Sequence, residues 1–341
     1  MTTNRQLRWR PYFFEIFTVA NFIVIFVIVA PANPIVLTSI PDTFTSFIPT
    51  LTTYVGIGVA VRGAIAWYRG ELRKYWRIVR SAGWLIDTVR LVIFGALMIH
   101  TYFWIKLVVP LVHPVLYDQE LWDIEQRMFF GYAPNIFFLD LFSQRLVLTA
   151  IDWSYARIFF ASMSVAFIFF LSDPSRRLRA AFASGNSLLW IAGAWLYMMI
   201  PSLGPALRFP DVWLPFANGL ALTQNFQALL MKNYRAVLRL PGGGSLSNIQ
   251  LMFGVAAFPS LHVAFQTFAF LWMRRLWVYG EIVFGIFALT ILIGSVVTGW
   301  HYLLDGIAGM VMAVICYWCA ASMWRIGEWL RLRKALSPSA V

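Results

Sequence analysis

The chain has 341 residues, of which 60% are hydrophobic and 12% are charged. So little polar surface excludes a water-soluble domain and predicts an integral membrane protein. The net charge of +12 would also fit a nucleic-acid-binding protein, so the distribution of the basic residues has to separate the two classes.

Eight apolar stretches are each long enough to cross a bilayer as one helix, because a hydrocarbon core about 30 Å thick needs roughly 20 apolar residues. They cover approximately residues 12–30, 46–66, 84–105, 153–171, 184–203, 261–273 with its flanks, 281–300 and 303–324. No small-residue cleavage site follows the first stretch, so we expect a retained span and not a secretion signal. The predicted fold class is all-α, a polytopic membrane bundle of about eight transmembrane helices.

Basic residues gather in alternate connections between these stretches. The N-terminus, the second, fourth and sixth connections and the C-terminal tail hold 17 of the 27 Lys and Arg residues. By the positive-inside rule this side faces the cytoplasm, which places both termini inside. Two long connections, 106–152 and 204–260, lie on the opposite side. Membrane topology thus explains the basic charge, and no nucleic-acid partner is expected.

The first long connection contains a run of acidic residues among aromatic ones. These residues are Asp118, Glu120, Asp123 and Glu125. The pattern favours an amphipathic segment that lies at the outer membrane surface. A metal site is the alternative, because the four carboxylates are close in sequence, although no convergent ligand geometry follows from their spacing.

Two histidines at the ends of predicted spans are the candidate catalytic residues. His262 begins a span in "FPSLHVAF", and His301, 39 residues later, begins another in "TGWHYLLDG". One crossing, an arginine-marked turn and a crossing back return the second ring to the depth of the first. Ionisable groups at membrane depth usually mark function because burying them is unfavourable. A single histidine there would more often be structural, as we expect for His100 and His113.

Asp305 follows His301 by four residues, so in a helix the two side chains share a face. The carboxylate can then hold one imidazole nitrogen protonated and leave the other free to attack an electrophile.

The stretches "FPSLH" and "GSVVTGWHYLLDGIAG" resemble two signature motifs of the type 2 phosphatidic acid phosphatase superfamily, P-S-G-H and S-R-x5-H-x3-D. The resemblance implies that the last six spans form a helical catalytic core. It also implies that His301 attacks phosphorus, that Asp305 orients His301 and that His262 protonates the leaving oxygen. This chemistry is reasonable because a phosphohistidine divides phosphate transfer into two easier steps. It requires no metal and no other cofactor.

The chain also departs from these motifs. Ser295 replaces the arginine of the histidine–aspartate motif, Leu261 replaces the glycine of P-S-G-H, and K-x6-R-P does not occur in that form in the connection 106–152. Phosphate contacts must therefore come from other residues. The candidates are Arg208, Lys232, Arg235, Arg239 and Ser260. For the basic cluster 232–239, a solvated or headgroup-facing helix side is the alternative.

Two further stretches, "LYDQELWDIEQRMFFGYAP" and "PSLGPALR", are similar to the branch that contains inositol phosphorylceramide synthases. That similarity implies a transferase that moves an inositol phosphate from a phospholipid donor to a lipid hydroxyl acceptor. A lipid phosphate phosphatase is the first alternative, and a non-catalytic membrane transporter or a structural membrane protein is the second. We expect the enzyme in the cell membrane, with its active site outside the cytoplasm and membrane lipids as its partners.

Three regions are predicted on this basis. Residues 1–83 hold two N-terminal spans and a basic cytoplasmic connection. Residues 84–325 hold the six-helix catalytic core and both long connections, of which 204–260 would cover the site. Residues 326–341 form a cytoplasmic tail.

Overall fold

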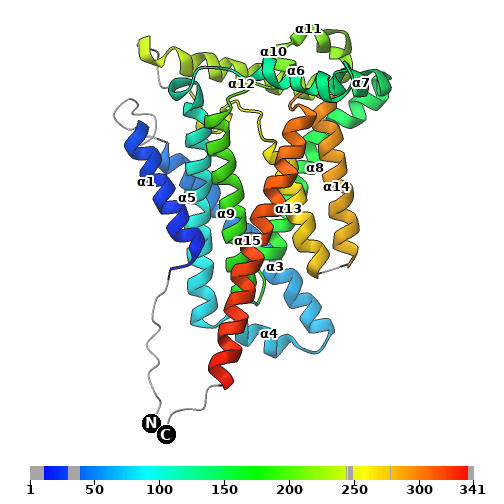
Figure 1. The fold of residues 1–341 in the computed structure, drawn as a ribbon. Helices are drawn as coiled ribbons and strands as arrows, with labels where there is room; N and C mark the ends of the chain where they lie inside the picture. Colours follow the sequence, from blue (N-terminus) through cyan, green and yellow to red (C-terminus); the bar gives the residue numbers. More distant parts are fainter. Residues whose placement is uncertain (1–10, 30–38, 243, 245–248, 277, 337–341) are drawn as a thin grey trace, which may run out of the picture.

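The computed structural model describes residues 11–29, 39–242, 244, 249–276 and 278–336. Within these ranges the chain is helical and forms no strand. Long helices run side by side, and shorter helices lie across one end of them (Figure 1). We call the described residues of 118–141 and 205–253 the cap, and the end that they cover the cap end.

The long helices are α1 (Phe13–Val29), α3 (Ile40–Tyr68), α5 (Ala82–Val112), α8 (Arg145–Leu171), α9 (Arg176–Met199), α13 (Leu261–Leu276), α14 (Val278–Val297) and α15 (Leu303–Leu336). The cap contains α6 (Asp118–Met128), α7 (Pro134–Leu141), α10 (Pro205–Arg208), α11 (Pro210–Trp213), α12 (Ala221–Leu238) and short 3-10 turns. Helix α4 (Leu72–Val79) lies at the other end of the bundle (Figure 1).

In the part of the chain that the structure describes, five helices are long and apolar enough to cross a membrane. They are α3, α5, α8, the segment Tyr279–Val297 of α14 and the segment Leu303–Met323 of α15. These are the helices of an integral membrane protein, so the predicted all-α membrane class is confirmed.

The other three predicted spans fall on α1, α9 and α13, and the count of eight spans stays a prediction. Helices α1 and α13 have 17 and 16 residues, which is short for a span. Helix α9 has 24 residues but contains buried Ser184, Asn186 and Ser187. It packs against α1, α5 and α15, so interior contacts replace the lipid-facing apolar surface of an ordinary span.

Two glycines let neighbouring helices approach the start of α13. A Cβ added at Gly193 of α9 would collide with the Leu261 side chain, and one at Gly309 of α15 would collide with the Ser260 carbonyl oxygen. Because His262 follows Leu261 directly, these approaches fix the depth of that histidine in the bundle.

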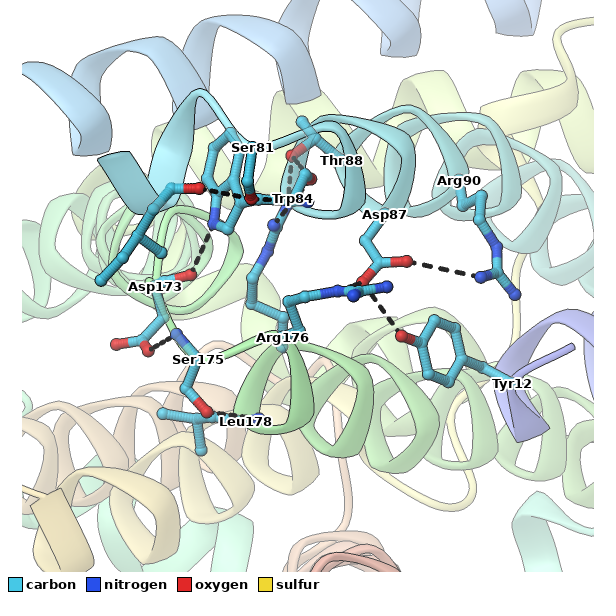
Figure 2. Close-up of polar contacts among 12 residues, drawn as sticks. Tyr12, Ser81, Trp84, Asp87, Thr88, Arg90, Asp173, Ser175, Arg176 and Leu178 are labelled. Carbon is cyan, nitrogen blue, oxygen red and sulfur yellow. Dashed lines mark hydrogen bonds and ion pairs between the residues drawn. The ribbon is translucent and has the colours of Figure 1, made fainter. Parts of the chain in front are cut away.

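A buried charge network joins α1, α5 and α9 near the other end of the bundle (Figure 2). Glu15 binds Arg90 through contacts of 2.5 Å. Asp87, which is 1% exposed, accepts from Tyr12 at 3.0 Å and also pairs with Arg90 and Arg176. Buried charges need such partners because desolvation makes an unpaired one unstable. The network therefore anchors α1 to the rest of the bundle.

Candidate active site

The structure brings the three predicted catalytic side chains together at the cap end. His262 lies in the first turn of α13, His301 lies between α14 and α15, and Asp305 lies in the first turn of α15. Nδ1 of His262 is 3.3 Å from Nε2 of His301, and Nδ1 of His301 is 3.3 Å from Oδ2 of Asp305. When Nδ1 of His301 donates to the carboxylate, Nε2 carries the lone pair.

His301 lies between two membrane-spanning segments and is 3% exposed. Burial, with a smaller contribution from the nearby ammonium group of Lys106, lowers the pKa of its imidazole from 6.5 to about 3. The ring is therefore neutral at physiological pH, which is the state in which Nε2 is a nucleophile.

Aromatic side chains of α8 enclose the His262 ring. The Phe159 ring meets it edge to face at 4.3 Å between centroids, and the Tyr155 ring lies at 5.7 Å. In the described part of the chain, His301 is the only hydrogen-bond partner recorded for the His262 ring. Packing, and not a polar anchor, thus sets the orientation of His262.

Ser260, which was predicted to bind phosphate, forms hydrogen bonds with the backbone at the start of α13 and α15. It is buried, its Oγ accepts the Val263 N–H at 3.4 Å, and its own N–H donates to the Asp305 carbonyl at 2.9 Å. Ser260 therefore caps α13 and ties the start of that helix to the start of α15.

The four predicted cations lie in the cap. Arg208, Lys232, Arg235 and Arg239 are all exposed. Among the described residues, no recorded hydrogen bond or ion pair joins any of them to His262 or His301. Their role in phosphate binding stays a prediction.

Lys106 of α5 lies closer to the histidines, and the sequence analysis missed it. Its ammonium nitrogen is 5.6 Å from the centroid of the buried Tyr197 ring, and its charge acts on His301. A sequence signal existed: Lys106 is followed at the spacing of K-x6-R-P by His113 and Pro114, with histidine in place of arginine. The His113 ring holds the end of α9 instead, because Nδ1 lies 2.8 Å from the Met198 carbonyl oxygen.

Two of the four acidic residues of α6 support the loops around the site. Asp118, on the buried face of α6, accepts from the N–H groups of Leu203 at 2.9 Å and Gly204 at 3.0 Å, and from the Tyr302 hydroxyl at 3.0 Å. Glu125, seven residues on, accepts the Leu304 N–H at 2.6 Å. The pKa of the Glu125 carboxyl is raised to about 7, mainly because the group is buried. The Asp305 charge also raises this pKa, whereas the Leu304 hydrogen bond lowers it.

The acidic run therefore does not act as a single polar face. Glu120 is exposed and Asp123 is half-buried, whereas Asp118 and Glu125 point into the protein. The described residues contain no group of three or more His, Cys, Asp or Glu side chains arranged to hold a metal ion. The supporting role of Asp118 and Glu125 was not predicted from the sequence, although their spacing puts them on one helical face.

Helix α7 also holds the segment that carries His301. Asn135 is fully buried, and its Nδ2 donates to the Val296 carbonyl at 2.8 Å and to the His301 carbonyl at 3.1 Å. The nucleophile candidate is thus fixed from the cap as well as by its own helices.

A helical membrane bundle that encloses two histidines, an aspartate and a lysine beneath a cap defines a membrane protein with a site suited to phosphoryl chemistry. The sequence profile described as "PAP2 superfamily" matches residues 119–319, more than half of the chain. The chain therefore belongs to the PAP2 superfamily, whose members are phosphatases or phosphotransferases. No curated protein and no solved structure matches it.

Proposed function

We propose that the protein is a membrane phosphotransferase that cleaves a phospholipid phosphoester through a phosphohistidine and passes the phosphoryl headgroup, with inositol phosphate as the first candidate, to a lipid hydroxyl. The observation that carries this proposal is the position of His301 Nε2, which lies opposite the His262 ring while Asp305 holds Nδ1. PAP2 superfamily membership supports chemistry on lipid phosphates.

In the first half-reaction, the lone pair on Nε2 of His301 attacks phosphorus and an N–P bond forms as the donor P–O bond breaks. The departing lipid oxygen takes a proton from His262, which the negative charge of the entering phosphate helps to keep protonated. Asp305 stabilises the positive charge that develops on the His301 ring. In the second half-reaction, His262 takes the proton of the acceptor hydroxyl, its oxygen attacks phosphorus, and the N–P bond breaks.

Lys106 is the strongest candidate for the cation that binds the phosphate. It is half-buried beside the Tyr197 ring, and a cation partly shielded from bulk water attracts an anion more strongly than an exposed one. Arg208, Lys232, Arg235 and Arg239 are candidates for contacts with the headgroup at the cap, where they are exposed. Ser260 would contribute by fixing the start of α13.

The partial cover over the half-buried His262 favours transfer over hydrolysis. Phe159 and Tyr155 cover His262 on the side of α8. Ser295 occupies the place of the superfamily arginine. It is buried, and its hydroxyl donates to the Leu292 carbonyl at 2.8 Å. A transferase has to keep water from resolving the phosphohistidine before the acceptor arrives. The distribution of arginines supports a cap on the side of the membrane away from the cytoplasm.

The test is to incubate the purified protein with a phosphoinositol lipid or with a lipid phosphate monoester, with and without ceramide or a diacylglycerol whose acyl chains differ from those of the donor. Acceptor-dependent formation of a new phospholipid would support transfer. Release of inositol phosphate from the diester, or of phosphate from the monoester, that is indifferent to the acceptor would identify hydrolysis. His301→Ala should abolish both reactions, whereas Glu120→Gln, on the exposed side of α6, serves as the matched control.

A further inference from the structure

The turn after α6, helix α7 and the start of α8 carry an apolar surface that the described protein does not cover. Phe130 is 94% exposed, Tyr132 74%, Phe137 58%, Leu141 59% and Leu146 84%. We call these five side chains the ledge. Several large apolar side chains exposed in one short segment usually mark a site of contact with lipid or with another protein.

The ledge lies beside the cap ends of two membrane-spanning helices. Helix α7 packs against α14 and lies close to the ends of α8 and α14 at the cap end (Figure 1). Apolar side chains stay exposed further along both helices, with Trp153 and Phe160 on α8 and Ile286 and Leu289 on α14. Since α8 and α14 are membrane-spanning, the lipid that covers them extends naturally onto the ledge.

The charges around the ledge also fit a lipid partner. Arg127 precedes Phe130 by three residues, Arg145 precedes Leu146 directly, and both are exposed. Apolar side chains flanked by arginines, with a tyrosine between them, are typical of segments at the boundary between acyl chains and phosphate headgroups.

The opposite side of α7 faces the candidate active site. Asn135, next to Ile136 and Phe137 in sequence, is the residue that binds the His301 carbonyl. A change in the position of α7 would therefore move the backbone of His301.

We propose that the ledge inserts into the membrane leaflet on the cap side, and that contact with phospholipid acyl chains sets the position of α7 and, through Asn135, of the His301 segment. This lipid contact goes beyond the proposed reaction and does not depend on it. It makes the membrane a positioning element of the site in addition to the source of the substrate.

The location can be tested with spin labels in phosphatidylcholine vesicles. In a Cys316→Ala, Cys319→Ala background, one label is placed by Phe137→Cys and the control label by Glu120→Cys. The label at 137 should be reached by oxygen and shielded from a water-soluble nickel chelate, whereas the label at 120 should show the reverse. Equal access of the chelate to both positions would overturn the proposal.

The coupling can be tested without any activity measurement. Phe137→Ser and Ile286→Ser each replace one exposed apolar side chain, but only the first lies on α7. In vesicles, Phe137→Ser should increase hydrogen exchange of the amides at 298–302 several-fold, and Ile286→Ser should leave it unchanged. Identical exchange in both variants would refute the coupling. Leu141→Ser is a second ledge variant if Phe137→Ser does not fold.

Discussion

Replacing Glu125 by glutamine should make the protein more stable at high pH. The pKa of Glu125 rises from 4.5 to about 7, chiefly because the carboxyl is buried. One pKa unit corresponds to about 1.4 kcal/mol, so ionising Glu125 costs the folded state roughly 3 kcal/mol. Glutamine keeps an oxygen for the Leu304 N–H and cannot ionise.

The pH window follows from the direction of this shift. The folded protein binds the Glu125 proton more tightly than the unfolded chain does. The contribution of Glu125 to stability is therefore largest below pH 4.5 and is lost as the pH rises to about 7. Glu125→Gln should therefore match the wild type at pH 4.5. At pH 8 it should be more stable by up to roughly 3 kcal/mol, which is a rise in Tm of roughly 5 °C.

Thermal unfolding in detergent, followed by tryptophan fluorescence from pH 4.5 to 8.5, measures this difference. Glu120→Gln is the matched control, because Glu120 is on the same helix but exposed, and its Tm should follow the wild type at every pH. A Tm difference for Glu125→Gln that does not change with pH, or a less stable variant at pH 8, would refute the argument from burial.

Three further predictions concern catalysis and the charge network. His301→Ala should eliminate an acid-labile, alkali-stable phosphoenzyme, and normal turnover in this variant would reject the mechanism. His262→Ala should slow turnover by about 10² to 10⁴-fold. Lys106→Met should lower kcat/KM for the phospholipid donor by about 10 to 100-fold, the loss expected for one charged contact, and an unchanged value would remove Lys106 from the site. Asp87→Ala should destabilise the protein by roughly 3 kcal/mol. This is the low end of the range for a broken buried ion pair, because Arg90 keeps Glu15 as a partner. Glu71→Ala removes an exposed ion pair and should change the free energy of unfolding by less than about 1 kcal/mol.

The sequence predicted what depends on local pattern. Composition alone indicated a helical membrane protein. The spacing of His262, His301 and Asp305 predicted that the three would meet, because two crossings of equal length and one helical turn fix their relative positions. The count of eight spans stays a prediction, and at α9 composition is a weak guide because a helix in the interior of the bundle does not need an apolar surface.

The remaining features of the site depend on contacts between distant segments. Lys106 lies at the end of an apolar stretch, and only the packing of α5 against α9 shows that it is half-buried next to Tyr197. The roles of Asp118 and Glu125 depend on backbone groups at 203–204 and 304, far along the chain. The sequence of α6 alone does not specify which backbone groups Asp118 and Glu125 bind.

The contacts of the two histidines also suggest which ring moves when substrate enters. A phosphoryl group has to reach Nε2 of His301, yet Nδ1 of His262 lies 3.3 Å from that atom. The His301 ring is held by Asp305, and its backbone is held by Asn135 from the cap. The His262 ring rests mainly on Phe159 and Tyr155, whose packing contacts permit rotation more readily than directional hydrogen bonds do. His262, the proposed proton donor, is therefore the adaptable half of the site, and His301, the proposed nucleophile, is the fixed half.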